Sequence, residues 1–237
     1  YMGQAIYGVG GGITWDSTWE SEYREVHQKA AVLYRKQARF QLITTGRISQ
    51  KSLLFEDQHL ERLTKASRYF AYPFDPEELR QKIEEECQAC DSHQDYRLRI
   101  SLSKSGEMEL SRQNLTPLSP TFCKAKLCLQ EADLQQAFTY FKTTHRPHLS
   151  LGEQEIIYHN AAGELLETSI GNLVLKIAGK LYTPPTSLGI LLGIYRQKLL
   201  ERGLVEEKVL TLKDLAQAEA IYGCNAVRGL YELRIES

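Results

Sequence analysis

Residues 154–184 read QEIIYHNAAGELLETSIGNLVLKIAGKLYTP and contain four short segments rich in branched and aromatic side chains, with a glycine between each segment and the next. Closely spaced strands of this kind, with few helices between them, are typical of a barrel-like β unit. The following stretch, GILLGIYRQKLLERG at residues 189–203, has the pattern of a helix that ends at a glycine. We therefore expect a barrel-like β domain over residues 131–237.

The part of the chain before this domain combines helices with alternating strands. Residues 56–75 carry apolar side chains at helical spacing up to a proline, and a second helix, opened by a proline, is expected from Asp75 to Cys90. Residues 95–110, DYRLRISLSKSGEMEL, alternate polar and apolar positions around a Ser-Gly hairpin turn. The sequence thus predicts an α+β fold, in which a small α/β domain over residues 38–130 precedes the barrel-like domain.

Composition excludes several classes of partner. The chain has 237 residues with 29 basic and 30 acidic side chains and a formal net charge of −1, so neither nucleic acid nor an anionic membrane is expected as its main partner. No apolar run reaches the ~18 residues of a membrane span, and the first residues lack the pattern of a secretion signal, so we expect a cytoplasmic protein. The five cysteines are scattered, and Cys87 and Cys90 have no second pair at zinc-ligand spacing, so neither a disulfide framework nor a metal site is expected.

Lys142 is a candidate functional residue because of its position. It follows the aromatic run AFTYF and precedes the polar stretch Thr143–Arg146, where the two domains are expected to meet. Ligands often bind at domain junctions. The more common setting for a lysine is a solvated surface, and the residues around Lys142 do not by themselves decide between the two.

Four short motifs and a weaker fifth follow one another along the chain. They are His59–Leu63, Lys142–Arg146, Glu167–Leu173, Thr183–Pro185 with Gly189–Arg196, and the weaker Cys224–Gly229. In this order, from about Phe40 to the C-terminus, they resemble the motifs of the fold-type IV pyridoxal-phosphate enzymes. That family includes branched-chain and D-amino-acid aminotransferases and 4-amino-4-deoxychorismate lyase.

The resemblance implies pyridoxal phosphate as the cofactor and assigns a role to each matched residue. Lys142 would carry the cofactor as a Schiff base and, once the substrate amine has freed it, would act as a general base. For that role its pKa must lie well below the ~10.4 of a free lysine. Glu167 would face the pyridine nitrogen of the cofactor and keep it protonated. Without the resemblance, Glu167 reads as an ordinary strand carboxylate.

The phosphate of such a cofactor requires a cation and hydrogen-bond donors. By the same resemblance Arg62 is the cation, since a planar guanidinium suits phosphate oxygens. Ile190 and Leu191 would open the following helix, so that backbone N–H groups and the helix dipole point at the phosphate. Asn225 would add a side-chain donor. The alternatives are a surface ion pair for Arg62 and a turn residue for Asn225.

The first 37 residues carry a second resemblance. The glycine run Gly10–Ile13, the pair Asp16-Ser17 and the helical stretch with Glu22 and Glu25 resemble the C-terminus of chorismate-utilising enzymes. In that family the acidic residues of this helix help to hold magnesium beside chorismate. The several hundred residues that complete that pocket are not in this sequence, so we expect residues 1–37 to be a synthase remnant without activity or metal.

The two resemblances together favour one reaction. A chorismate-enzyme tail joined to a fold-type IV domain looks like the bifunctional fusion in which aminodeoxychorismate synthase precedes the lyase that makes 4-aminobenzoate and pyruvate for folate synthesis. We therefore expect a homodimeric lyase acting on the small molecule 4-amino-4-deoxychorismate. The alternatives are a class IV amino-acid aminotransferase and a non-catalytic partner domain of the synthase. The joint presence of Lys142, Glu167 and Arg62 argues against the non-catalytic alternative.

The substrate of such a lyase carries two carboxylates, so cationic side chains should line its pocket. Arg47 is one candidate ligand, and Arg97 and Arg99, which share one face of a predicted strand, are two more. A solvated strand face explains Arg97 and Arg99 equally well. Thr45 is a candidate catalytic residue because its hydroxyl can donate a proton or a hydrogen bond.

Overall fold

The computed structural model describes residues 7–34, 39–118, 121–130, 137–150, 152 and 154–235. The chain divides into two compact units, Tyr1–Arg39 and Phe40–Ser237. Across the described ranges, no helix combines the length and the apolar character that crossing a bilayer requires.

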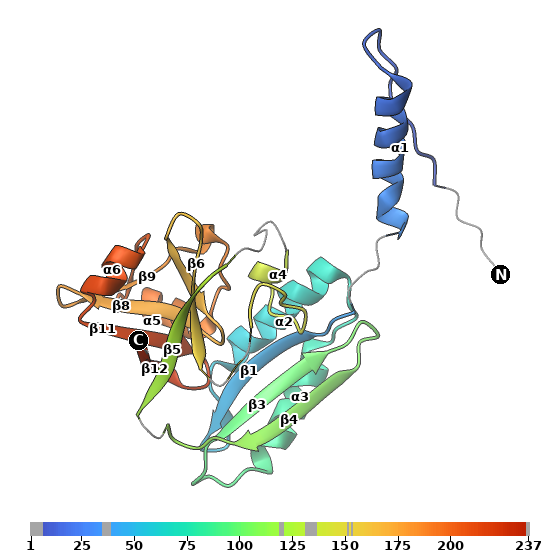
Figure 1. Ribbon diagram of the computed structural model, residues 1–237. Helices are drawn as coiled ribbons and strands as arrows, with labels where there is room; N and C mark the ends of the chain where they lie inside the picture. Colours follow the sequence, from blue (N-terminus) through green and yellow to red (C-terminus); the bar gives the residue numbers. More distant parts are fainter. Residues whose placement is uncertain are drawn as a thin grey trace. The chain divides into compact units, whose positions relative to one another are not determined.

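In the first unit, helix α1 spans Trp19–Tyr34 (Figure 1). Lys29 pairs with Glu25 one turn earlier and also donates to the carbonyl of Gly10 at 3.0 Å. These contacts hold the glycine-rich stretch against its own helix.

The second unit begins with a four-stranded antiparallel sheet in the order β2-β1-β3-β4. Two helices, α2 and α3, pack on this sheet (Figure 1). The strands are β1 (Leu42–Ser49), β2 (Ser52–Leu53), β3 (Tyr96–Leu102) and β4 (Met108–Asn114), and the helices are α2 (Glu56–Phe70) and α3 (Pro76–Gln88).

Local sequence explains these elements. The Asp75 side chain caps α3 by accepting the N–H groups of Glu77 and Glu78, and proline occupies the first turn. In β3 the alternate residues Leu98 and Ile100 are buried and join the core under the two helices. Burial of each such side chain contributes about 1.5–3 kcal/mol. The two helices and the hairpin predicted from the sequence are confirmed.

The rest of the second unit is an eight-stranded sheet in the order β10-β9-β8-β11-β12-β5-β6-β7. An additional pairing of β7 with β8 joins Glu167 to Asn172 and closes the part from β8 to β7 into a ring, which agrees with the predicted barrel-like domain. The strands are β5 (Phe122–Leu129), β6 (Glu155–His159), β7 (Leu165–Thr168), β8 (Asn172–Ile177), β9 (Lys180–Thr183), β10 (Glu206–Glu207), β11 (Ala220–Asn225) and β12 (Gly229–Ile235). The helices are α4 (Ala137–Tyr140), α5 (Ile194–Glu201) and α6 (Leu212–Gln217).

Two elements differ from the sequence-based expectation. Strand β5 lies before the expected boundary at residue 130, yet it pairs with β12 and β6 in the eight-stranded sheet. Helix α5 begins at Ile194 rather than at residue 189, because Gly189 adopts a left-handed conformation (φ 77°) after a short 3₁₀ turn and Gly193 is extended. The four strands predicted over residues 154–184 are confirmed as β6, β7, β8 and β9.

Candidate active site

Residues of both sheets line a cavity of about 360 Å³, a volume within the usual range for small-molecule sites. Strands β1 and β3 contribute Thr45 and Arg99, and the closure of the barrel-like sheet contributes Glu167 and Asn172. Lys142 lines the same cavity. Two sheets built from distant parts of the chain therefore share one site.

Lys142 lies in the loop after α4, and backbone hydrogen bonds hold this loop on the start of β1. The Ile43 N–H donates to the Lys142 carbonyl at 2.9 Å, and the Thr144 N–H donates to the Gln41 carbonyl at 2.9 Å. These bonds fix the backbone from the Lys142 carbonyl to Thr144 and so anchor Lys142 beside β1 at the cavity.

The cavity is strongly cationic. Among the described residues that line it, Glu167 is the only carboxylate. The cations are Arg62, Arg97, Arg99, Lys142 and Arg146. A site with this excess of positive charge suits a ligand that carries several negative charges.

The pKa of Lys142 is lowered to about 7. Burial is the largest cause, and the positive charges of four arginines follow: Arg62, Arg146, Arg97 and Arg99. Near neutral pH a large share of this side chain is therefore the neutral amine, which is the nucleophilic form.

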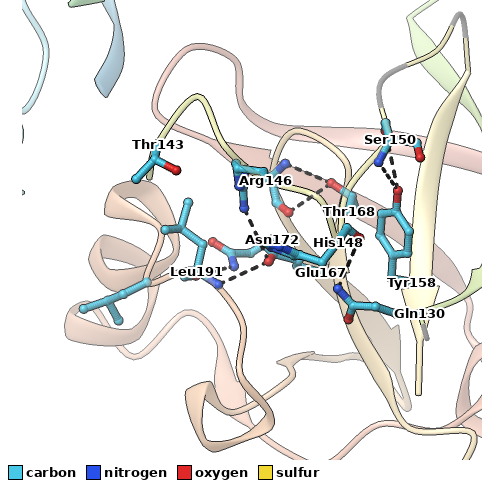
Figure 2. Close-up of polar contacts among 12 residues, drawn as sticks. Gln130, Thr143, Arg146, His148, Ser150, Tyr158, Glu167, Thr168, Asn172 and Leu191 are labelled. Atoms are coloured by element: carbon cyan, nitrogen blue, oxygen red, sulfur yellow. Dashed lines mark hydrogen bonds and ion pairs between the residues drawn. The ribbon is translucent and has the colours of Figure 1, made fainter. Parts of the chain in front are cut away.

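Glu167 is 3% exposed, and it lies where β7 meets β8. Its Oε1 accepts the Leu191 N–H at 3.4 Å and lies 3.5 Å from Nη2 of Arg146 (Figure 2). Burial raises the pKa of Glu167 to about 7, against the lowering effects of Arg146, the Leu191 N–H and Lys142. Both contacts are long, so the carboxylate can still accept a closer hydrogen bond from a group in the cavity.

Arg62 reaches the cavity from α2, one turn after the buried His59. The Nη2 of Arg62 donates to the Leu192 carbonyl at 2.7 Å. Burial and then the charge of Arg146 lower its pKa to about 10, which leaves it cationic at neutral pH. His59 Nδ1 lies 2.6 Å from Thr44 Oγ1, and burial lowers the pKa of His59 to about 3, so the neutral ring ties α2 to β1.

The two residues predicted to face the phosphate, Ile190 and Leu191, lie in different environments. Leu191 lines the cavity, whereas Ile190 is buried in an apolar cluster. The N-terminus of α5 reaches the cavity through Gly193 and Ile194 instead. A Cβ on Gly193 would lie 1.9 Å from Asn172 Oδ1, so only glycine permits this approach. The helix N-terminus is therefore available at the site, but it begins later than predicted.

The remaining predicted residues separate into two groups. Thr45, Arg97 and Arg99 line the cavity, with Thr45 opposite Arg99 in the β1–β3 register. Arg47 shares the strand face of Thr45 but lies outside the lining, and its guanidinium is held by Asp95. The structure thus separates Arg47 from the candidate substrate ligands.

Asn225 lines the cavity, but its amide stabilises its own turn. Its Oδ1 accepts the N–H groups of Val227 at 3.0 Å and Arg228 at 2.9 Å, and its Nδ2 lies 3.4 Å from the Tyr231 hydroxyl. This arrangement supports the turn role that the sequence left open for Asn225.

Among the charged residues of the described cavity lining, Arg146 is the one to which the sequence assigned no role. Its side chain is 15% exposed, and its Nε and Nη2 are buried with no hydrogen-bond acceptor among the residues that the structure describes. The sequence did offer one signal for a role of Arg146: it ends the Lys142 motif and adds a second cation to the same loop.

These residues fit pyridoxal phosphate, the cofactor implied by the motifs. Its aldehyde needs an amine that is neutral near pH 7, its ring nitrogen a buried carboxylate, and its phosphate a surplus of positive charge. One cavity offers all three. Within the described ranges, the buried donors of Arg146 have no acceptor and the contacts of Glu167 are long, so these polar groups do not satisfy one another.

The lowered pKa of Lys142 predicts a pH effect on the cofactor-free protein. Between about pH 7 and the ordinary value of 10.5, the unfolded chain binds a proton at this residue that the folded chain does not. The free energy of unfolding should therefore rise with pH over this window, by up to about 1.4 kcal/mol per pH unit. Urea unfolding from pH 7 to 9 measures the slope. Lys142→Met is the control, because this variant keeps every titratable group except Lys142. Equal slopes of the free energy of unfolding against pH in the two proteins would contradict the prediction.

Two family models match the chain. The class IV aminotransferase model matches residues 41–234, and the chorismate-binding enzyme model matches residues 1–35. Aminodeoxychorismate lyase of Saccharomyces cerevisiae is 30% identical over 119 residues, which are 39% of this chain and 32% of that protein. The matched stretches span about a third of the length of the curated relatives, 35% and 32%.

Solved structures agree with the family. A candidate amino-acid aminotransferase from Mesorhizobium loti has a TM-score of 0.75 and 28% identity, over 83% of this chain and all of that chain. A candidate 4-amino-4-deoxychorismate lyase from Haemophilus somnus has a TM-score of 0.65 and 25% identity, over 82% of this chain and all of that chain. The chain belongs to the class IV aminotransferase family, the fold-type IV enzymes whose cofactor is pyridoxal phosphate.

Proposed function

We propose that this chain is a lyase that converts 4-amino-4-deoxychorismate to 4-aminobenzoate and pyruvate. The observation that carries the proposal is the match of residues 1–35 to chorismate-binding enzymes, directly before the class IV domain. That pairing has a chemical reason when the second domain acts on an amine made from chorismate. The family resemblance further supports a cytoplasmic homodimer.

Different residues of the cavity are proposed to bind the cofactor and the substrate. Arg62 and the N-terminus of α5 are proposed to hold the phosphate of the cofactor, since both border the cavity and both are positive. Glu167 would accept a hydrogen bond from the protonated ring nitrogen and keep that nitrogen protonated. Arg97 and Arg99, on the β3 side, are proposed to bind the two carboxylates of the substrate.

When bound, pyridoxal phosphate supplies an electron sink for the carbon that carries the substrate amine. The neutral Nζ of Lys142 is proposed to take the proton from that carbon. The bond from the neighbouring ring carbon to the enolpyruvyl oxygen then breaks, so the ring becomes aromatic and the enolpyruvate takes up a proton to leave as pyruvate. Thr45 is proposed to donate a hydrogen bond or that proton; its place in the cavity lining, with 8% of the residue exposed, supports this role.

An amino-acid aminotransferase is the second candidate function. The observation that favours it is the 28% identity to the Mesorhizobium loti protein, over the whole of that chain. The early proton removal at Lys142 is common to both reactions, so the cavity alone does not separate them. An aminotransferase requires a 2-oxo acid acceptor, whereas the lyase does not.

The purified protein, loaded with pyridoxal phosphate, should release equal amounts of pyruvate and 4-aminobenzoate from 4-amino-4-deoxychorismate without a 2-oxo acid. Pyruvate is measured by a coupled reduction and 4-aminobenzoate by chromatography. Turnover of amino acids with 2-oxoglutarate, and none of 4-amino-4-deoxychorismate, would replace the lyase with the aminotransferase.

Replacing Arg62 with Ala should weaken binding of the cofactor. The loss of a charge-assisted hydrogen bond is worth about 1.5–3 kcal/mol, which corresponds to about a 10- to 150-fold rise in Kd. Absorbance titration of the cofactor-free protein measures this change. Arg80→Ala is the matched control, since Arg80 pairs with Glu56 and Asp57 outside the cavity. Unchanged affinity in Arg62→Ala would place the phosphate elsewhere.

A further inference from the structure

Arg146 and Lys142 stand at the two ends of one short loop, and both line the cavity. The loop is stiffened from within, because the Thr143 hydroxyl donates to the His145 carbonyl at 2.8 Å. Its other side is held on β1 by the backbone bonds described above. The two positive groups therefore cannot easily move apart.

The guanidinium of Arg146 also meets Glu167. Its Nη2 lies 3.5 Å from Glu167 Oε1, and the Leu191 N–H approaches the same oxygen from another direction (Figure 2). In the described part of the chain, Arg146 is the ion-pair partner of this cavity carboxylate. Arg146 thus acts on a carboxyl group and on an amine, both of which the proposed reaction needs in their deprotonated forms.

We propose that Arg146 is a positioning residue that sets both charge states at once, keeping Glu167 as a carboxylate and Lys142 as a neutral amine. A fixed positive charge stabilises a nearby anion and destabilises a nearby cation. Both effects favour loss of a proton. The use of these charge states rests on the proposed cofactor chemistry, but the states themselves belong to the protein without cofactor.

The charges around the two groups support this assignment. Arg146 is the largest cause that lowers the pKa of Glu167, with Lys142 as a weaker one. Arg146 also lowers the pKa of Lys142, after burial and Arg62. Arg97 and Arg99 act on Lys142 from β3 and are not among the causes for Glu167. Arg146 therefore has an electrostatic signature that the arginines of β3 lack.

The carboxylate half is tested by infrared titration of the full chain without cofactor. The carbonyl stretch of protonated Glu167 is identified as the band that Glu167→Gln removes. Because Lys142 would otherwise compensate by gaining a proton, the titration is done in a Lys142→Met background. Arg146→Gln should raise the titration midpoint of Glu167 by about 1–3 pH units, and Arg99→Gln should leave it in place.

The amine half is tested by labelling. The rate at which Lys142 reacts with an uncharged acylating reagent is followed against pH by peptide mass spectrometry, in a Glu167→Gln background. Both Arg146→Gln and Arg99→Gln should raise the midpoint of this rate profile. Arg146→Lys keeps the charge and should restore both midpoints in part, which a loss of packing alone would not explain.

A Glu167 midpoint that stays in place in Arg146→Gln overturns the proposal, as does an equal shift of Glu167 in Arg99→Gln. If Arg146→Gln does not fold, Arg146→Met, which also removes the charge, takes its place and should raise both midpoints; an unchanged Glu167 midpoint in that variant overturns the proposal. Failure of the lyase assay would leave these titrations unchanged, so the two proposals fail separately.

Discussion

Lys142→Ala is expected to lose covalent attachment of the cofactor and to lower the reaction rate by about 10²–10⁴-fold or more, since general-base catalysis alone contributes that much. The structure places Lys142 in the cationic cavity with a pKa lowered to about 7. Borohydride treatment of the loaded protein, followed by peptide mapping, should place the label on Lys142 and find none in the variant.

Lys176→Ala is the matched control for this change. Lys176 lies on β8 and pairs with Glu219, away from the residues that line the cavity. This variant should keep both the label and the rate. If the protein without any substitution carried the label on a lysine other than Lys142, the wrong amine would have been assigned.

Glu167→Gln is expected to leave the cofactor bound while lowering the rate by orders of magnitude. A neutral amide cannot hold the ring nitrogen protonated, so the electron sink weakens while the phosphate contacts remain. Two measurements test this: absorbance titration gives the affinity for the cofactor, and pyruvate release gives the turnover rate. This pattern is the reverse of that expected for Arg62→Ala.

Glu164→Gln serves as its control. Glu164 precedes β7, accepts from Asn160 at 2.7 Å and does not line the cavity, so the same chemical change there should leave the rate unaltered. If Glu167→Gln instead lost the cofactor and kept the rate of the remaining loaded protein, the roles of Glu167 and Arg62 would have to be exchanged.

Local sequence was sufficient for most of the secondary structure. The alternation around β3, the proline and aspartate at the start of α3, and the glycine-separated strands of residues 154–184 each reflect interactions between near neighbours. The ordered motifs were also enough to indicate the family and its cofactor, because they combine residue types that are jointly specific for that chemistry.

Placement of side chains in the site depended on distant parts of the chain. Arg47 and Thr45 lie two positions apart on one strand face, yet only Thr45 lines the cavity, because Asp95 of the neighbouring strand region holds Arg47. Residue 193, just before α5, approaches the side chain of Asn172 on β8 so closely that a Cβ there would lie 1.9 Å from Asn172 Oδ1, which explains the glycine. Neither partner could be assigned from local spacing.

The sequence by itself determined most of the elements, the family, and the amine, carboxylate and guanidinium on which the proposed chemistry depends. Tertiary structure alone decided that Lys142, Glu167 and Arg146 share one buried cavity, and so decided their electrostatics. The physical reason is that a pKa depends on burial and on the distances between charges. Here both arise from closing the sheet between β7 and β8 and from holding the Lys142 loop on β1, which are contacts between segments far apart in the chain.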